Sequence, residues 1–272
     1  MSEATKLVLL RALIAVVAAG LGGVLGVVWK RPSHKTLCAL VSFAAGALLS
    51  VTIVDIMPDA MAISGWAVTL GATALGLTVF YLIGKYVSYV CPACAASAME
   101  HNTAYLRLGI LLMVALGIHS TVDGVAIALS STSANLALLA VLILFAVSYH
   151  KVPEGLALVS VARLAGITRW KALALTILIE LTTGLGAFIG LAAVRAMPPN
   201  SPWLGFHLGL VAGSFLYIVG FALITEMMEH ERRSIIAYLV LGFVVILLTS
   251  FVLKSIGIGE SRHALAAMVP KI

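Results

Sequence analysis

Long apolar stretches alternate with short polar links along the whole chain. Eight of these stretches are long enough to cross a bilayer core, which takes about 20 helical residues. They lack the strict apolar and polar alternation of a membrane β-strand, so the pattern predicts helices. The predicted spans are residues 6–29, 36–58, 65–89, 105–131, 134–162, 170–196, 203–229 and 235–256.

The composition supports the same class of protein. Hydrophobic residues make up 62% of the 272 residues and charged residues only 10%, whereas a soluble domain has about 25% charged residues. We therefore expect an all-α polytopic membrane protein, with residues 1–272 forming one transmembrane domain. The first span lacks the small-residue cleavage site of a signal peptide, so we expect it to be retained.

Basic residues indicate the orientation of the spans. One set of loops holds nearly all of them, whereas the opposite set holds only Arg195. Because Lys and Arg accumulate on the cytoplasmic side and the number of spans is even, both termini are predicted to lie outside. The net charge of +6 is therefore a topology signal, and nucleic-acid binding is not expected. The basic loop residues are Lys30, Arg31, Lys35, Arg107, Arg163, Arg169, Lys171, Arg232 and Arg233.

The second and seventh spans are faintly alike. An Ala-Gly pair at 45–46 precedes the acidic segment 55–59, and an Ala-Gly pair at 212–213 precedes the acidic segment 226–229. These two spans run in opposite directions through the membrane. The likeness predicts an inverted repeat, which is a common plan among transporters.

Two neighbouring spans carry the same arrangement of metal-binding residue types near their middle. They read HSTVDG at residues 119–124 and HKVPEG at residues 150–155. In each motif a His precedes a carboxylate by four residues, so His119 and Asp123 share one helix face, as do His150 and Glu154. Two imidazoles and two carboxylates suit a cation such as Zn²⁺. A single His in a span is as well explained by an interhelical hydrogen bond, but the repeated pattern favours a shared metal site.

Three further residues of these motifs have predicted roles. Pro153 removes the backbone hydrogen bond to the carbonyl of Tyr149. We predict a helix break there that gives ligands or water access to the site, and an ordinary packing kink is the alternative. Gly124 and Gly155 are expected to let the two motif-bearing helices approach each other closely.

These motifs resemble those of the ZIP family of divalent-metal transporters, whose fourth span typically reads H-N-x-x-[DE]-G and whose fifth reads H-x-x-P-E-G. The MPDA that ends the second predicted span is similar to the family's L-P-E-A, and the resemblance covers essentially the whole chain. It implies eight spans with both termini outside and transport of Zn²⁺, Fe²⁺ and related ions towards the cytoplasm. The family's primary metal site maps onto His119, Asp123, His150 and Glu154.

The resemblance also implies a second metal site, at Ser120, Lys151 and the acidic residue of the sixth span, Glu180. Two of these positions depart from the family pattern, since Ser120 replaces an Asn and Lys151 replaces a ligand. An ammonium group does not ligate a metal, and it repels a nearby cation. We predict that Lys151 stands where a second metal would stand, pairs with Glu180 or Glu154, and leaves a single-metal site. The alternative is that Lys151 snorkels or pairs only for packing.

Other polar residues are candidates for the ion pathway. Asp55 and Asp59 lie four residues apart at the predicted outer end of the second span, and His207 opens the seventh span on the same side. They suit an entrance that attracts cations, and a solvated helix end is an equal alternative for the two acids. Glu226 lies deeper, near the inner end of the seventh span, on the expected exit path.

A lone CxxC motif, Cys91 and Cys94, lies in the longer link at 90–104 together with His101. These residues suit a loop metal site, since the family often has metal-sensing sequence in this loop. A reduced pair without function is the alternative.

We therefore predict a transporter of a divalent transition metal, with Zn²⁺ preferred over Fe²⁺, Mn²⁺ or Cd²⁺. The sequence has no G-x-x-x-x-G-K-[ST] motif for ATP, so we expect the ion's own gradient or a coupled ion to drive transport. An intramembrane metalloenzyme at the same site and a redox protein built on Cys91 and Cys94 are the alternatives. No cofactor beyond the transported metal is expected. The expected partners are the metal ion and the lipid bilayer of a bacterial plasma membrane, and a homodimer is compatible with the sequence.

Overall fold

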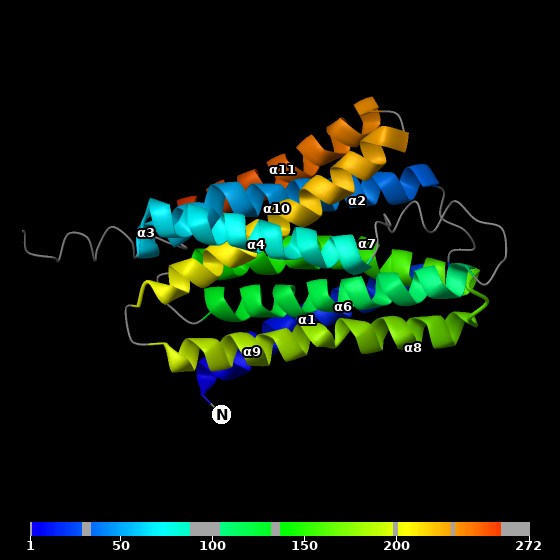
Figure 1. The fold of residues 1–272 in the computed structure, drawn as a ribbon, viewed down its shortest axis with the longest axis horizontal. Coiled ribbons are helices and arrows are strands. Elements are labelled where there is room, and N and C mark those ends of the chain that lie inside the picture. The colour runs from blue at the N-terminus through cyan, green and yellow to red at the C-terminus, as the bar shows by residue number, and fades with distance from the viewer. Residues whose placement is uncertain are drawn as a thin grey trace, which may run out of the picture.

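A computed structural model of the chain describes residues 2–28, 34–87, 104–131, 137–197, 201–229 and 232–256. Their regular structure is helical, and the helices lie side by side along the long axis of the molecule (Figure 1). The elements are α1 (Glu3–Val28), α2 (His34–Ser50), the π-helix η1 (Val51–Ile56), α3 (Met57–Ser64), α4 (Trp66–Val87), α6 (Ala104–Ser130), α7 (Ala137–Leu164), α8 (Arg169–Glu180), α9 (Thr182–Ala196), α10 (Trp203–Glu229) and α11 (Arg232–Ser255).

Seven helical stretches among the described residues are long and apolar enough to cross a membrane. A helix suits this setting because it satisfies its backbone polar groups internally. The stretches are Glu3–Val28, Cys38–Ser64, Trp66–Lys85, Ala137–Arg163, Arg169–Ala196, Trp203–Gly220 and Arg233–Ser255. In α6 the apolar stretch Leu116–Ser130 is shorter than these seven and is not counted among them. The expected polytopic helical membrane protein is confirmed, while the number of eight spans and the side on which the termini lie stay predictions.

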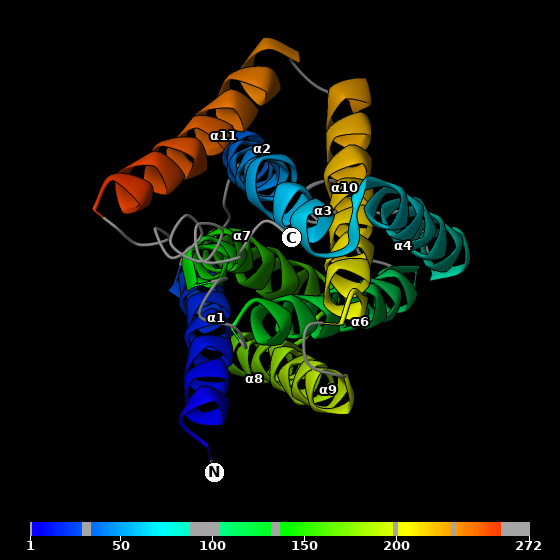
Figure 2. The ribbon, with the colours of Figure 1, turned by 90° about the vertical axis from the view of Figure 1, so that its left-hand side faces the viewer.

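The helices form two groups, which lie in the lower and upper parts of Figure 2. One group, here called the site bundle, contains α1, α6, α7, α8 and α9. The other, the second bundle, contains α2, η1, α3, α4, α10 and α11. The closest helix pairs lie within a bundle: α1 with α7 and α6 with α9, then α2 with α11 and α4 with α10.

Reciprocal glycines explain how these pairs come so close. In the pair of α1 and α7, a Cβ on Gly22 would overlap the carbonyl oxygen of Val152, and a Cβ on Gly155 would overlap that of Ala19. The other three pairs have the same arrangement. Their glycines are Gly124 and Gly186 in α6 and α9, Gly46 and Gly242 in α2 and α11, and Gly76 and Gly213 in α4 and α10. Small residues permit this contact between membrane helices.

This packing corrects the prediction for the two motif glycines. Gly124 faces α9 and Gly155 faces α1, so neither brings α6 and α7 together. The reason is the helix period, since adjacent residues point about 100° apart around the axis. With Asp123 and Glu154 turned towards the facing helix, the next residue turns outwards. The glycines therefore let each motif-bearing helix pack closely on a third helix, α6 on α9 and α7 on α1.

The second predicted span also differs from the expectation. It was expected to end at residue 58, but the helical rod continues to Ser64 and contains a π-helical segment before Pro58. Pro58 has no N–H, which disturbs the regular backbone pattern of the preceding turn. In that turn the Met57 N–H bonds to the carbonyl of Thr52, five residues earlier. Gly65, at a φ of 80°, then ends the rod.

The sixth predicted span is interrupted, whereas the fifth is not. In the sixth, α8 ends at Glu180 and α9 begins at Thr182, so the break directly follows the span's acidic residue. The Thr182 hydroxyl donates to the carbonyl of Gly117 in α6, at 2.9 Å. In the fifth, α7 runs through Pro153 from Ala137 to Leu164, so the predicted break is wrong. Next to Pro153, α7 packs closely on α1 through Val152 and Gly155.

Polar contacts tie the ends of α1 into the site bundle. The three contacts are Arg11 Nη1 with Ser131 Oγ (2.6 Å), Arg195 Nη2 with Thr5 Oγ1 (2.9 Å) and Arg163 Nη1 with the carbonyl of Gly26 (2.7 Å). Between the two bundles, in contrast, apolar side chains of both form one buried cluster. Its members include Leu48 and Val51 from the second bundle, and Ile127 and Ile143 from the site bundle.

Candidate metal site

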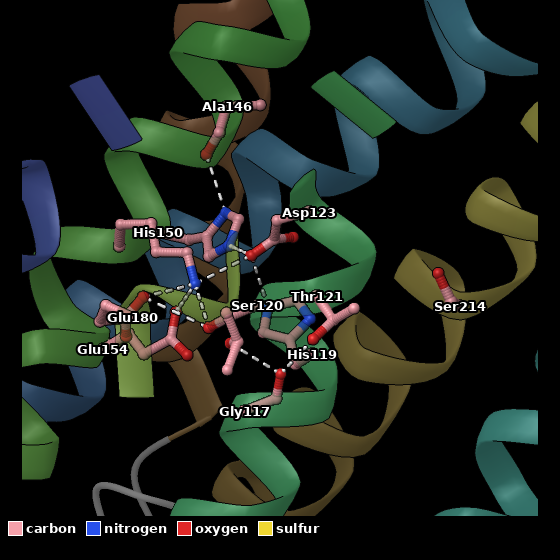
Figure 3. Close-up of polar contacts among 12 residues, drawn as sticks. Gly117, His119, Ser120, Thr121, Asp123, Ala146, His150, Glu154, Glu180 and Ser214 are labelled. Carbon is pink, nitrogen blue, oxygen red and sulfur yellow. Dashed lines mark hydrogen bonds and ion pairs between the residues drawn. The ribbon is translucent and has the colours of Figure 1, made fainter. Parts of the chain in front are cut away.

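The four residues predicted as metal ligands lie together in the site bundle. His119 and Asp123 come from α6, and His150 and Glu154 come from α7. One ligand atom from each residue lies within 4.8 Å of the others, and all four residues are buried. The two imidazole rings have centroids 5.2 Å apart. Figure 3 shows His150 and Asp123 facing each other, with Glu154 beside them.

The backbone fixes the orientation of His150. Its Nδ1 lies 3.0 Å from the carbonyl oxygen of Ala146, one turn earlier in α7. Because a carbonyl only accepts, Nδ1 carries the proton. In the neutral ring, Nε2 then presents a lone pair to Asp123 Oδ2, which is 3.1 Å away. Two lone pairs attract each other only through a cation or a proton between them. His150 Nε2 and Asp123 Oδ2 therefore have the arrangement of two ligands of one cation.

Other polar atoms of the cluster are also open to a ligand. His119 Nε2 lies 3.6 Å from Asp123 Oδ2. Among the described residues, His119 Nδ1, Asp123 Oδ1 and Glu154 Oε1 are buried without a hydrogen-bond partner. Buried polar atoms are ordinarily paired. A bound cation would satisfy the oxygens, and the set of two nitrogens and two carboxylates suits Zn²⁺.

Lys151 lies beside this cluster and is fully buried. Its Nζ contacts Ser120 Oγ at 2.6 Å, Glu180 Oε2 at 2.8 Å, Glu154 Oε2 at 2.9 Å and Asp123 Oδ2 at 3.0 Å. The predicted pairing with Glu180 or Glu154 is confirmed for both acids. The contact with Asp123 was not predicted. The alternative that Lys151 snorkels is wrong, because its amino group ends among buried carboxylates.

The charges of this group are unequal. Asp123, Glu154 and Glu180 supply three negative charges and Lys151 supplies one positive charge, which leaves −2 with neutral imidazoles. Buried charges are stable only when they are paired and hydrogen-bonded. One divalent cation brings the sum to zero.

The three residues mapped to a second metal site form a hydrogen-bonded group of their own. Ser120 accepts a hydrogen bond from Lys151 and donates one to Glu180 Oε2, at 3.3 Å. Their side chains are buried. Lys151 Nζ therefore occupies the centre of this group.

The predicted entrance residues Asp55 and Asp59 lie in the second bundle and do not belong to the four-residue cluster. Asp55, in η1, is 6% exposed and Asp59, in α3, is 3% exposed, so the alternative of a solvated helix end is wrong. The rod continues past both acids to Ser64, so neither lies at a helix end. Asp55 Oδ1 accepts from Ser250 Oγ at 3.1 Å and pairs with Lys254 Nζ at 3.4 Å. These contacts join the rod to α11.

His207 is half-buried near the start of α10, with its Nδ1 2.6 Å from the carbonyl oxygen of Trp203. Its ring packs against the ring of Phe206, at 5.7 Å between centroids. His207 is thus not part of the four-residue cluster. The side chain of Glu226 and the predicted loop site at Cys91, Cys94 and His101 lie outside the described residues.

Sequence reasoning missed two partners of the predicted residues. It did not place Lys151 against Asp123, although a Lys directly after a candidate ligand was a signal. It did not link Lys254 to Asp55, about 200 residues apart. Opposite charges in two apolar spans were the available signal.

The fold and the site together define a helical membrane protein with a buried cluster of His, Asp and Glu side chains that could hold a metal ion. Residues 95–250, more than half of the chain, match the family described as ZIP Zinc transporter. The chain therefore belongs to the ZIP zinc transporter family.

Several curated proteins are similar over part of their length. An uncharacterized protein of Methanocaldococcus jannaschii is 27% identical over 173 residues, which cover 63% of this chain and 68% of that protein. Zinc transporter ZupT of an Enterobacter species is 27% identical over 122 residues, 43% of this chain and 48% of ZupT. ZupT of Escherichia coli is 28% identical over 132 residues, 46% of this chain and 50% of ZupT. The aligned part thus spans about half the length of these ZupT proteins.

Proposed function

We propose that this protein carries a divalent transition metal, with Zn²⁺ as its main substrate, across the plasma membrane into the cytoplasm. The observation that carries the proposal is the convergence of His119, Asp123, His150 and Glu154, whose ligand atoms lie within 4.8 Å of one another. Zn²⁺ prefers four such nitrogen and oxygen ligands. The name of the ZupT relatives supports zinc, while Fe²⁺, Mn²⁺ and Cd²⁺ are the further candidates.

We propose eight spans with both termini outside. The helix α6 has 27 residues, which is long enough for the additional span. With this topology the loops rich in Lys and Arg face the cytoplasm. A carrier in this orientation takes the ion at the outer side and releases it at the inner side.

The arrangement of the two bundles supports alternating exposure of the site. All four candidate ligands belong to the site bundle, and so do the polar contacts that tie down α1. The buried cluster between the bundles is apolar. Apolar attraction is non-directional, so one bundle can shift against the other while the ligand set stays intact.

A metalloenzyme at the same cluster is less well supported. A catalytic zinc site keeps one coordination position open for water, whereas the cluster here offers four protein ligands. The ZIP family is a family of transporters.

We further propose that the site holds one metal ion per chain. The ammonium of Lys151 lies among Ser120, Glu180, Glu154 and Asp123, where a second cation would meet like charge at close range. Purified protein saturated with Zn²⁺ and freed of excess metal is expected to contain one ion per chain by elemental analysis, with His150→Ala as the depleted control. Two ions per chain, both lost in His150→Ala, would contradict the single-metal site.

Metal uptake into proteoliposomes tests the proposed function. Wild-type protein is expected to take up Zn²⁺ with saturation, and His150→Ala is expected to reduce uptake to the level of empty liposomes, because it removes the best-oriented ligand. The matched control is Tyr149→Phe, which alters the preceding residue but keeps the ring that packs against Phe145. Parallel assays with Fe²⁺, Mn²⁺ and Cd²⁺ rank the substrates. Equal flux in wild type and His150→Ala would sink the proposal.

A further inference from the structure

We propose that Lys151 is a tethered cation that competes with the transported metal for Asp123 and Glu154. On metal release the ammonium returns to these carboxylates, so that the empty site is never left with three unpaired acids. This inference rests on the proposed function, because it takes Asp123 and Glu154 as metal ligands.

The competition follows from shared oxygen atoms. Asp123 Oδ2 is 3.0 Å from Lys151 Nζ and also 3.1 Å from His150 Nε2. Glu154 Oε2 is 2.9 Å from the same ammonium. Asp123 Oδ2 is the oxygen that faces both imidazoles, so a metal held by the imidazoles and this oxygen takes it from Lys151. A metal on Glu154 adds a second cation to a carboxylate with which the ammonium already pairs. The ammonium and the metal thus compete for two of the four ligands.

The remaining contacts of Lys151 hold it close by. Ser120 and Glu180 do not belong to the ligand cluster, yet they lie 2.6 Å and 2.8 Å from Nζ. Ser120 also bonds to Glu180, which fixes the position of both groups. The contacts of Lys151 Nζ therefore fall into two sets: anchor contacts with Ser120 and Glu180, and ligand contacts with Asp123 and Glu154. We infer that Lys151 keeps the anchor contacts when the metal is bound. It regains the ligand contacts when the metal leaves.

Charge shows what the lysine contributes. With Lys151 the site carries −2 when empty and 0 with one divalent ion, whereas a neutral residue there would give −3 and −1. Three buried acids without a partner are costly, so a site without the lysine retains its metal more strongly. Lys151 lowers the free energy of the empty site, and this makes release and the return of the empty carrier easier.

Lys151→Gln is the direct test, because it removes the charge and keeps a polar side chain. Equilibrium dialysis of the purified variant against Zn²⁺ is expected to show a dissociation constant lower by about tenfold or more. Its maximal uptake rate in proteoliposomes is expected to fall, since release becomes slower. Lys151→Arg, which keeps the charge, is expected to bind Zn²⁺ more weakly than Lys151→Gln does. Unchanged or weaker binding by a folded Lys151→Gln variant would overturn the inference.

Ser120→Ala is an independent test, because its Zn²⁺ dissociation constant is expected to change in the opposite direction to that of Lys151→Gln. This test remains possible even if Lys151→Gln does not fold. It removes an anchor of Lys151 without changing any charge, so the ammonium should occupy Asp123 and Glu154 more strongly. The Zn²⁺ dissociation constant is expected to rise by about tenfold or more, which corresponds to the loss of one hydrogen bond to a charged group. A dissociation constant equal to or below that of wild type would refute the competition.

The two proposals fail in different ways. If wild-type protein transports Zn²⁺ but Lys151→Gln binds it no more tightly, the tethered-cation inference fails alone. If wild-type protein does not transport but Lys151→Gln still binds Zn²⁺ more tightly, the transport function fails and the competition at the site stands.

Discussion

Asp123→Asn is expected to abolish metal uptake and to weaken Zn²⁺ binding by about 100-fold or more. Among the carboxylates that the structure describes, Asp123 Oδ2 is the one oxygen within 3.6 Å of both imidazoles and of the Lys151 ammonium. An amide of the same size removes the negative charge from this position. Breaking one buried charged partner costs about 3–5 kcal/mol, and about 1.4 kcal/mol already corresponds to a tenfold change in affinity.

Zn²⁺ titration and proteoliposome uptake measure this effect together. Glu3→Gln is a suitable control, because Glu3 is an exposed carboxylate that pairs only with the nearby Lys6 among its described contacts. Thermal unfolding in detergent separates a loss of binding from a loss of fold. Binding and uptake at wild-type levels in Asp123→Asn would place the metal elsewhere.

Gly186→Ala is expected to destabilise the protein and to lower metal uptake strongly. An added Cβ would overlap the carbonyl oxygen of Thr121, which lies between His119 and Asp123 in α6. The α6 and α9 helices must then separate, and forcing an extra methyl group into a packed contact costs about 1–3 kcal/mol. Because Thr121 lies between two candidate ligands, the separation also displaces the site.

Gly184→Ala is the matched control for Gly186→Ala. Gly184 lies two residues earlier in α9, and a Cβ there would meet no atom within 4 Å. Alanine also has a higher helix propensity than glycine, by about 1 kcal/mol, so this variant should unfold at an equal or higher temperature than wild type. A similar loss of stability in both variants would rule out the close contact with Thr121 as the cause.

The candidate site was largely predictable because its rule is local. The spacing of four residues brings His119 onto the same helix face as Asp123, whatever the helix packs against. The same rule applies to His150 and Glu154. The repeat of the pattern in two adjacent spans then predicted that these faces meet, and the structure brings all four residues together. Whether they bind a metal stays a prediction.

The errors arose where a residue's role depends on a distant helix. Gly124 and Gly155 were expected to join α6 to α7, but they contact α9 and α1. Asp55 and Asp59 were open to a reading as a solvated helix end, yet the rod continues to Ser64 and both acids are buried. No local pattern tells which helix lies behind a glycine or how far a rod extends past a proline.

By itself, the sequence determined the class of the protein, the helical nature of its spans and the faces that carry the ligand types. These properties follow from hydropathy and from the helix period, which act within one segment. The tertiary structure alone decided that Lys151 reaches three carboxylates at once and that reciprocal glycines assemble the helices in close pairs. The physical reason is that charge pairing and close packing depend on distances between segments far apart in the chain, and those distances exist only after the helices have assembled.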